Sequence, residues 1–147
     1  MQSDNSILFD TNILIYNQDR KSKFYDLASQ YHDKVLDGKL QGVIASQNIL
    51  EFSAVMMNKK IISKPLSQKM VSGEIQKYIN SGTFTFIYPT NETHAIYLNL
   101  LKKYQLKNPH QVFDLYLVAT MLSSKVHVIL TANGKDFQFE EISVIQL

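Results

Sequence analysis

The sequence predicts an α/β fold in which helices cover both faces of a central, mainly parallel sheet. Short apolar runs such as Ile7-Leu8-Phe9 recur along the chain, and they have the length and composition of buried strands. Longer segments with apolar residues at helical spacing separate these runs. No repeat or linker interrupts the 147 residues, so we expect a single domain, residues 1–147, with four to five strands.

The expected elements follow from this alternation. We expect strands at residues 7–9, 42–45, 83–88, 126–130 and 142–145, the last of them at an edge of the sheet. We expect helices at residues 12–16, 21–36, 47–56, 66–79, 91–104 and 109–124, with a break at 61–65. Ser46 is a favoured N-cap for the third of these helices, and Asn108-Pro109 supplies a cap and a first-turn proline for the last.

Composition excludes several classes of protein. The chain has no cysteine and therefore no disulfide, thiolate metal site or cysteine nucleophile, which fits a reducing, cytoplasmic compartment. No apolar run approaches the ~20 residues that cross a bilayer, and no secretory signal is apparent, so we expect no membrane association. The net charge of +2 allows nucleic-acid binding without arguing for it.

Any basic surface must come from clustered lysines, which are also typical of solvated helix faces. Two such clusters are Lys59, Lys60, Lys64 and Lys69, and Lys102, Lys103 and Lys107.

Acidic and amide side chains lie at the ends of several expected core elements. Asp10 follows the first strand, Glu51 lies on the helix after the second, and Asp114 lies within an apolar helix. Asn133 and Asp136 follow the strand at 126–130. The carboxyl ends of parallel strands meet at one edge of a sheet, where such folds place their functional crevice. We therefore expect these side chains at one site, with Asp114 joining them if the start of its helix points there.

A cluster of carboxylates repels itself unless cations bind. Mg²⁺ and Mn²⁺ prefer carboxylate oxygens, and they activate water and stabilise charge on a phosphate during in-line displacement. The pattern therefore favours a site for one or two divalent ions. Other chemistries have weaker support, because the four histidines lack zinc spacing and the chain has no Gly-rich phosphate loop and no Gly-x-Ser-x-Gly elbow.

Each of these residues also has a simpler interpretation. Asp10 is a favourable helix N-cap, and Glu51 is compatible with a partly exposed helix position. Asp114 is compatible with an ion pair to a lysine, and Asn133-Gly134 is a strong turn signal. Together these interpretations require four unrelated coincidences at one edge of the sheet, so we prefer the shared site.

The four motifs, in this order and in these strand and helix contexts, resemble the PIN domain across essentially the whole chain. The pattern is most similar to the VapC-type toxins of toxin–antitoxin pairs. The motifs are Asp10-Thr11-Asn12, Glu51 on its helix, Asp114 within residues 112–120, and Thr131 to Phe137. The resemblance implies a PIN-like, Rossmann-like three-layer α/β/α fold and an endoribonuclease that depends on Mg²⁺ or Mn²⁺.

The resemblance also implies roles for individual residues. Asp10, Glu51 and Asp114 match the family's catalytic, metal-binding carboxylates. Asn133 stands at the fourth position, which is acidic in many members and Asn in many of the toxins, and Asp136 is its nearest acidic substitute. The supporting residues Thr11, Asn12 and Thr131 match polar positions that orient the carboxylates or the water.

The implied partners are RNA (transfer, ribosomal or messenger), a cognate antitoxin whose tail blocks the site, and a second copy of the chain in a homodimer. Two other functions remain open. One is a non-catalytic PIN-like module that binds RNA or protein, which Asn133 motivates because an amide brings no charge to a metal site. The other is a nuclease of similar acidic-site design that acts on DNA.

Overall fold

A computed structural model describes residues 5–147 and confirms the predicted α/β architecture. Its centre is a five-stranded sheet of order β3-β2-β1-β4-β5, in which every neighbouring pair is parallel. The strands are β1 (Ser6–Phe9), β2 (Gln41–Ala45), β3 (Thr85–Ile87), β4 (Val128–Thr131) and β5 (Ser143–Gln146). The last strand lies at an edge, as predicted, and β3 forms the other edge.

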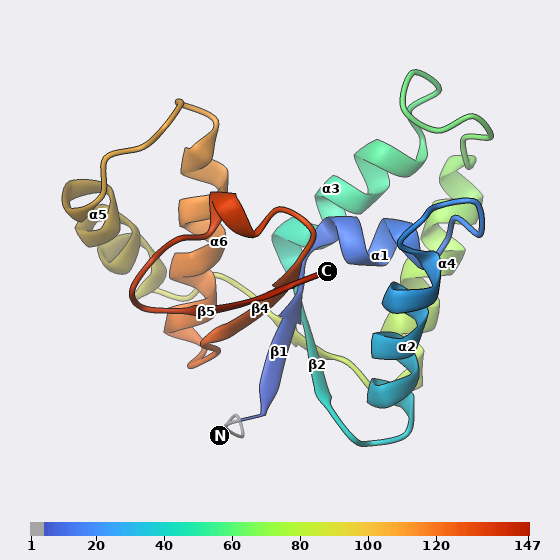
Figure 1. Cartoon of the computed structure of the whole chain (residues 1–147), viewed down its shortest axis with the longest axis horizontal. Coiled ribbons are helices and arrows are strands. Elements are labelled where there is room, and N and C mark those ends of the chain that lie inside the picture. Colours follow the sequence, from blue (N-terminus) through green and yellow to red (C-terminus); the bar gives the residue numbers. More distant parts are fainter. Residues whose placement is uncertain (1–4) are drawn as a thin grey trace.

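Helices cover both faces of the sheet (Figure 1). One face carries α1 (Thr11–Tyr16), α2 (Tyr25–Leu36), α3 (Ser46–Met56) and α4 (Gln68–Ser81). The other carries α5 (Thr93–Lys103) and α6 (Gln111–Ser123), and a short 3₁₀ helix, η1 (Gly134–Asp136), follows β4. No helix within residues 5–147 is both long enough and apolar enough to span a membrane.

The central strand β1 shows how the two cores form. Its side chains alternate between the faces of the sheet, so Leu8 packs with the α5 and α6 side while Ile7 and Phe9 pack with the α1 to α4 side. All four residues of β1 are buried, because helices cover both of its faces. The apolar run that predicted this strand is therefore explained by its central position.

Four helices start later than the sequence predicts: α2, α4, α5 and, as described below, α6. Hydrogen bonds from the backbone to serine side chains accompany the starts of α2 and α4. Helix α2 begins at Tyr25 rather than residue 21, since the Ser22 hydroxyl accepts a hydrogen bond from the backbone N–H of Phe24 at 3.1 Å. Helix α4 begins at Gln68 rather than 66, with Ser67 as its N-cap. Helix α5 begins at Thr93 rather than 91.

Two predicted caps are wrong. The N-cap of α3 is Ala45 rather than Ser46, because the Asn48 side chain accepts the backbone N–H of Ala45 at 3.0 Å. The segment Asn108-Pro109 does not open α6. Residues 108–110 form a turn instead, and the helix begins at Gln111, whose side chain accepts the backbone N–H of Lys107 at 2.9 Å.

The register of the sheet brings the ends of β1 and β4 together. Phe9 lies opposite Leu130, and the backbone N–H of Asp10 donates to the carbonyl of Leu130 at 3.0 Å. Asp10 therefore lies beside Thr131, the last residue of β4. Helices α1 and α3 and the 3₁₀ helix η1 all start at this carboxyl edge of the sheet (Figure 1).

Candidate functional site

Asp10 lies at the carboxyl end of β1 with its side chain only 8% exposed. Its Oδ1 atom accepts the backbone N–H of Thr11 at 2.8 Å, so it caps α1 as the simpler interpretation proposed. Its Oδ2 atom accepts the Thr131 hydroxyl at 2.7 Å and the Asn12 amide at 3.3 Å. The carboxylate is thus fixed by its own helix and by the neighbouring strand at the same time.

Burial is the main influence on the charge of Asp10. Loss of hydration raises the pKa of its carboxyl to about 6, although the hydrogen bonds from Thr131 and Thr11 act in the opposite direction. The negative charges of Glu51 and Asp136 raise it further. Asp10 therefore has acidic neighbours from two other parts of the chain.

Glu51 turns from α3 toward α1. Its Oε2 atom accepts the Thr11 hydroxyl at 2.7 Å, and its Oε1 atom accepts the Gln47 amide at 2.8 Å. The Thr11 oxygen in turn accepts the amide of the buried Asn48 at 3.1 Å, so the single hydroxyl proton of Thr11 is free to point at Glu51. Glu51 is therefore held in place rather than left to extend into solvent.

Asp114 lies in the first turn of α6 and is half-buried. Burial raises the pKa of its carboxyl to about 7, and the charges of Asp10, Asp136 and Glu51 add to this effect in that order. No described residue donates a hydrogen bond to its side chain, and none forms an ion pair with it. The lysine partner of the simpler interpretation is therefore not found within residues 5–147.

The loop after β4 supplies a fourth acid. The side chain of Asn133 is exposed, and its backbone N–H donates to the Thr131 hydroxyl at 3.0 Å. Asp136 is half-buried and raises the pKa of both Asp10 and Asp114. Within this loop, Asp136 therefore contributes the negative charge near the other carboxylates.

Two glutamines hold this loop in place. The Gln146 side chain of β5 accepts the backbone N–H of Gly134 at 2.8 Å and donates to the carbonyl of Ala132 at 2.7 Å. The buried Gln111 side chain donates to the carbonyl of Asp136 at 3.2 Å. Side chains from β5 and α6 thus fix both ends of η1.

The four carboxylates supply the kind of donor atoms that a hard divalent cation binds. Within residues 5–147, no Lys, Arg or His side chain lies within 4.0 Å of the carboxylates of Asp10, Glu51, Asp114 or Asp136. All of the candidate donors are oxygens, which Mg²⁺ and Mn²⁺ prefer. No three acidic or histidine side chains in the described part of the chain converge closely enough to form a ready-made metal site. The acids are neighbours that repel each other, and a cation would relieve that repulsion.

No family model and no curated protein matches the sequence. Solved structures do match over nearly the full length of the chain. One is VapBC2 from Rickettsia felis bound to a promoter DNA fragment, with 15% identity and a TM-score of 0.66 over 97% of this chain and 98% of that one. Another is a toxin–antitoxin complex from Klebsiella pneumoniae, with 21% identity and a TM-score of 0.59 over 96% and 99%.

A third is VapC20 from Mycobacterium tuberculosis, a sarcin–ricin loop cleaving toxin, with 10% identity and a TM-score of 0.62 over 92% and 98%. The fold is PIN-like. At these sequence identities, the likeness shows the fold alone. The chemistry of the site has to be argued from the residues of this chain.

The PIN-like fold brings the predicted acids together from separate elements. Asp10 comes from the end of β1, Glu51 from α3 and Asp114 from α6, and the three affect one another electrostatically. The predicted supporting residues Thr11 and Thr131 both donate hydroxyl hydrogen bonds to these carboxylates. Roles in metal binding and catalysis remain a prediction for all of them.

Three amide side chains of the PIN-like site were missed in the sequence. Gln47 donates to Glu51, Asn48 supports Thr11, and Gln111 holds the backbone of Asp136. Gln47 lies four residues before Glu51, a helical spacing that could have signalled the pair. Asn48 and Gln111 are buried polar residues beside apolar runs, which is a weaker signal because their partners are distant in the sequence.

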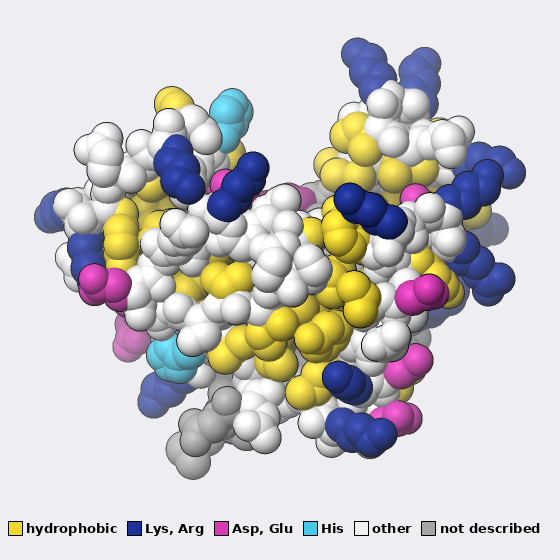
Figure 2. Space-filling view, viewed as in Figure 1, with side chains coloured by type: hydrophobic (Ala, Val, Ile, Leu, Met, Phe, Trp, Pro, Cys, Tyr) yellow, Lys and Arg dark blue, Asp and Glu magenta, His cyan; other side chains and the backbone are white. Residues whose placement is uncertain are grey.

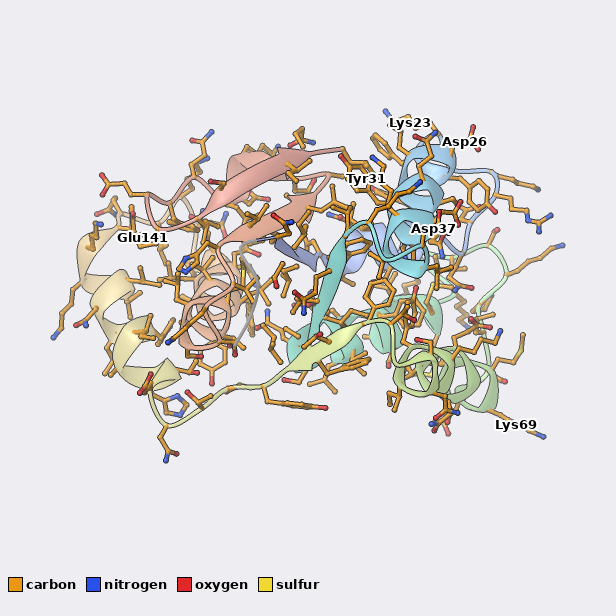
Figure 3. All side chains as sticks on the ribbon, turned by 90° about the horizontal axis from the view of Figure 1, so that it is seen from below. Lys23, Asp26, Tyr31, Asp37, Lys69 and Glu141 are labelled. Atoms are coloured by element: carbon orange, nitrogen blue, oxygen red, sulfur yellow. The ribbon has the colours of Figure 1, made fainter. Side chains whose placement is uncertain are left out.

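Basic side chains flank the carboxyl edge of the PIN-like fold. In the space-filling view, a notch separates the α5–α6 lobe from the α3 lobe, and Lys or Arg side chains lie on both sides of it (Figure 2). The Lys107 ammonium group donates to the carbonyl of Lys135 at 2.9 Å, which places Lys107 next to η1. Lys69, by contrast, points away from the sheet at the outer side of α4 (Figure 3).

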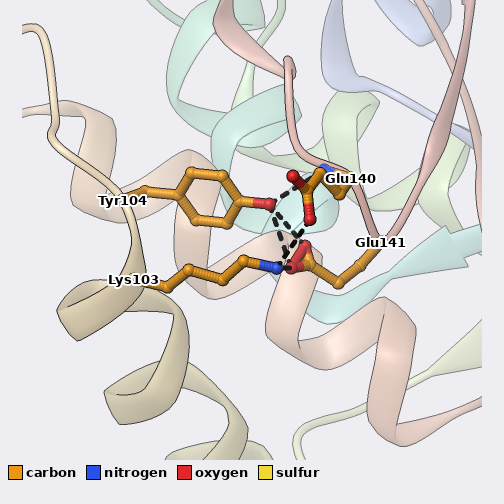
Figure 4. A network of polar contacts seen from close by, with 4 residues as sticks. All are labelled: Lys103, Tyr104, Glu140 and Glu141. Atoms are coloured by element: carbon orange, nitrogen blue, oxygen red, sulfur yellow. Dashed lines mark hydrogen bonds and ion pairs between the residues drawn. The ribbon is translucent and has the colours of Figure 1, made fainter.

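One lysine of the second cluster has another role. Lys103 forms ion pairs with Glu140 at 3.0 Å and Glu141 at 2.8 Å, and the Tyr104 hydroxyl also donates to Glu141 (Figure 4). The contacts join the end of α5 to the segment before β5. Lys103 is therefore engaged in a structural network, and we exclude it from the basic surface.

Proposed function

We propose that this chain is a divalent-metal-dependent endoribonuclease, the toxin of a type II toxin–antitoxin pair, acting in the cytoplasm. The observation that carries the proposal is the group of four carboxylates at one sheet edge, which have no cation partner within residues 5–147. Their like charges add to the effect of burial in raising the pKa of Asp10 and of Asp114. The likeness to toxin–antitoxin structures, one of them of a sarcin–ricin loop cleaving toxin, supports RNA as the substrate class.

Asp10, Glu51 and Asp114 would hold Mg²⁺ or Mn²⁺. The bound ion would supply a water of lowered pKa and stabilise negative charge on the scissile phosphate. The hydroxyls of Thr11 and Thr131 keep two of the carboxylates in fixed orientations.

We assign the fourth acidic role to Asp136 rather than to Asn133. Asp136 interacts electrostatically with both Asp10 and Asp114, whereas the Asn133 side chain is exposed and uncharged. Asn133 would contribute at most its amide oxygen at the rim of the site, as a candidate ligand without charge.

The RNA backbone would lie across the notch between the two lobes. Lysines or arginines on both sides of the notch (Figure 2) would bind phosphates without reading sequence. Candidates are Lys107, which contacts η1, and the lysines at 59, 60 and 64 in the connection between α3 and α4. Cleavage at subsaturating RNA should therefore weaken steeply as salt rises.

The decisive experiment is cleavage of a panel of transfer, ribosomal and messenger RNA fragments in Mg²⁺ or Mn²⁺. Asp10→Asn should lower the rate on the order of 100-fold or more, because it removes a charged ligand. The matched control is Asp26→Asn, which makes the same change at an exposed position on α2 (Figure 3). Equal cleavage by Asp10→Asn and the unaltered protein would refute the mechanism.

A non-catalytic module is the second candidate, favoured by the uncharged Asn133 and by the absence of a ready-made metal site among the described residues. Titration calorimetry with Mn²⁺ distinguishes the two, because a binding module without turnover needs no metal. Single-stranded and flapped DNA in the same cleavage panel would reveal a DNA nuclease.

The proposed partners are a cognate antitoxin and a second copy of the chain. A co-expressed antitoxin should stop RNA cleavage by covering the acidic edge. Leu98 and Leu101 of α5 are exposed at 51% and 38%, and they offer apolar surface for a homodimer. Light scattering after size exclusion would give the mass of the particle directly.

A further inference from the structure

The side chain of Gln47 spans the gap between α3 and α6. Its amide nitrogen donates to Oε1 of Glu51 at 2.8 Å and to the backbone carbonyl of Phe113 at 3.0 Å. Phe113 immediately precedes Asp114. One amide group, with two N–H bonds to give, therefore joins the carboxylate of Glu51 to the stretch of backbone that carries Asp114.

This contact completes the restraint on Glu51. The Thr11 hydroxyl holds Oε2 from α1, and Gln47 holds Oε1 from the preceding turn of α3. Asp10 and Asp114 both interact with Glu51 through like charge, which favours its rotation toward solvent. Two donors on different elements oppose that rotation.

The chemistry of the residue suits the position. A lysine or arginine would also donate to both oxygens, but its positive charge would compete with a metal ion for the carboxylates. A glutamate at residue 47 would accept rather than donate and would add to the repulsion. A neutral amide links the two elements and leaves the negative charge of the site unchanged.

We propose that Gln47 is a positioning residue of the metal site, which sets the place of Glu51 relative to Asp114. The inference rests on the proposed function, because that function supplies the ion. Gln47 acts through Glu51, so it should affect metal affinity without contributing to the binding of RNA.

The test is calorimetric titration with Mn²⁺ of the unaltered protein, Gln47→Ala and Gln47→Met. Both variants lack the amide, and methionine keeps the length and bulk of the side chain if alanine disturbs folding. We expect Mn²⁺ to bind both variants about 10- to 100-fold more weakly. The matched control is Gln76→Ala on the exposed face of α4, whose side chain, among residues 5–147, hydrogen-bonds only to Asn80.

RNA cleavage measured against Mn²⁺ concentration gives a second readout. In Gln47→Met the midpoint should move to higher Mn²⁺, while the plateau rate and the KM for RNA stay at their original values. A plateau that excess Mn²⁺ does not restore would assign Gln47 to folding and overturn the inference.

The other outcomes separate this inference from the proposed function. If the unaltered protein binds Mn²⁺ and both Gln47 variants bind it equally well, the positioning role is wrong and the ribonuclease proposal stands. If the unaltered protein binds no Mn²⁺, the metal-dependent function is wrong, and the inference falls with it.

Discussion

Neutral donors surround the carboxylates of Asp10 and Glu51. Hydroxyl groups of Thr11 and Thr131 and the amides of Asn12 and Gln47 supply the side-chain hydrogen bonds that these two acids accept. Such donors fix the oxygens but leave the negative charge in place. The arrangement suits cation binding, and it makes the site a source of instability when no cation is bound.

Asp114→Asn should stabilise the metal-free protein while abolishing cleavage. Its carboxylate accepts no hydrogen bond from residues 5–147, so an amide loses none there, and the repulsion from Asp10 and Asp136 disappears. Because the residue is only half-buried, we expect a gain of roughly 1 kcal/mol at pH 8. Chemical denaturation in EDTA measures it, and a loss of stability would show that the acids do not strain the folded state.

Asp136→Asn and Asn133→Ala together test which residue supplies the fourth ligand. We expect Asp136→Asn to weaken Mn²⁺ binding about 10-fold, because it removes charge near both Asp10 and Asp114. Asn133→Ala should change it less than about 3-fold, since that side chain is exposed. The opposite order would assign the fourth ligand to Asn133.

The acids could be predicted from the sequence and their amide partners could not. Asp10 and Asp114 stand out because charged residues are rare within apolar runs. Asn48 and Gln111 depend on contacts with Thr11, 37 residues away, and with Asp136, 25 residues away. Nothing local to either amide identifies such a partner.

At the scale of elements, every strand and α-helix was predicted, but the 3₁₀ helix η1 was not. The errors in bounds lie at the starts of four helices and at strand ends, such as those of β3, which spans Thr85–Ile87 rather than residues 83–88. Ser46 and Asn108-Pro109 have suitable cap chemistry, yet Asn48 caps α3 from inside the helix and α6 starts only at Gln111. Several polar side chains near a helix start can compete for the same free N–H groups. Tertiary contacts decide which of them succeeds.

Gly134→Ala tests whether the hydrogen bond from Gly134 to Gln146 of β5 fixes η1 in place. A Cβ atom at residue 134 would collide with Oε1 of Gln146 and would lie 3.0 Å from Cγ1 of Val144. Gln146 would therefore have to move and release the backbone N–H of residue 134. We expect a loss of about 1–2 kcal/mol in unfolding free energy and weaker Mn²⁺ binding.

The control for this change is Gly73→Ala. Residue 73 lies within α4 with open space around its Cβ position, so alanine should stabilise the helix by up to about 1 kcal/mol. Unfolding by urea with both variants makes the comparison. Equal effects of the two substitutions would mean that β5 does not hold the loop.

For the whole molecule, the acidic site makes stability depend on pH and on metal. The pKa of Asp10 is about 6 in the folded state against 3.8 as its ordinary value, so the folded protein binds the proton more tightly. That contribution is fully present below about pH 4 and is lost as pH rises through 6. Asp114 acts in the same direction up to about pH 7.

In EDTA, Asp10 should therefore lower the unfolding free energy by about 1 kcal/mol between pH 5 and pH 8. Saturating Mn²⁺ at pH 8 should raise stability, because it binds the folded state preferentially. Denaturation of the unaltered protein and of Asp10→Asn at both pH values isolates the contribution. If the metal-free unaltered protein instead gains stability relative to Asp10→Asn between pH 5 and pH 8, the assignment is wrong.

The parallel sheet followed from the alternation of strands and helices, but its order β3-β2-β1-β4-β5 did not. The apolar runs at residues 7–9 and 42–45 both predict buried strands, so composition does not show which of the two lies at the centre of the sheet. Strand order depends on pairs of segments that are far apart in the sequence, such as β1 and β4, and no single segment encodes such a pair.

The connection between α3 and α4, residues 57–67, is mostly exposed and carries Lys59, Lys60 and Lys64. It separates a first fragment with Asp10 and Glu51 from a second with Asp114 and Asp136. Neither fragment holds the full set of acids, and β1 must pair with β4 across the cut to bring the two halves of the set together. The connection is therefore a suitable place to divide the chain for a split-protein reporter. Under the proposed function, neither fragment would cleave RNA alone, and activity would return only when fusion partners bring the two together.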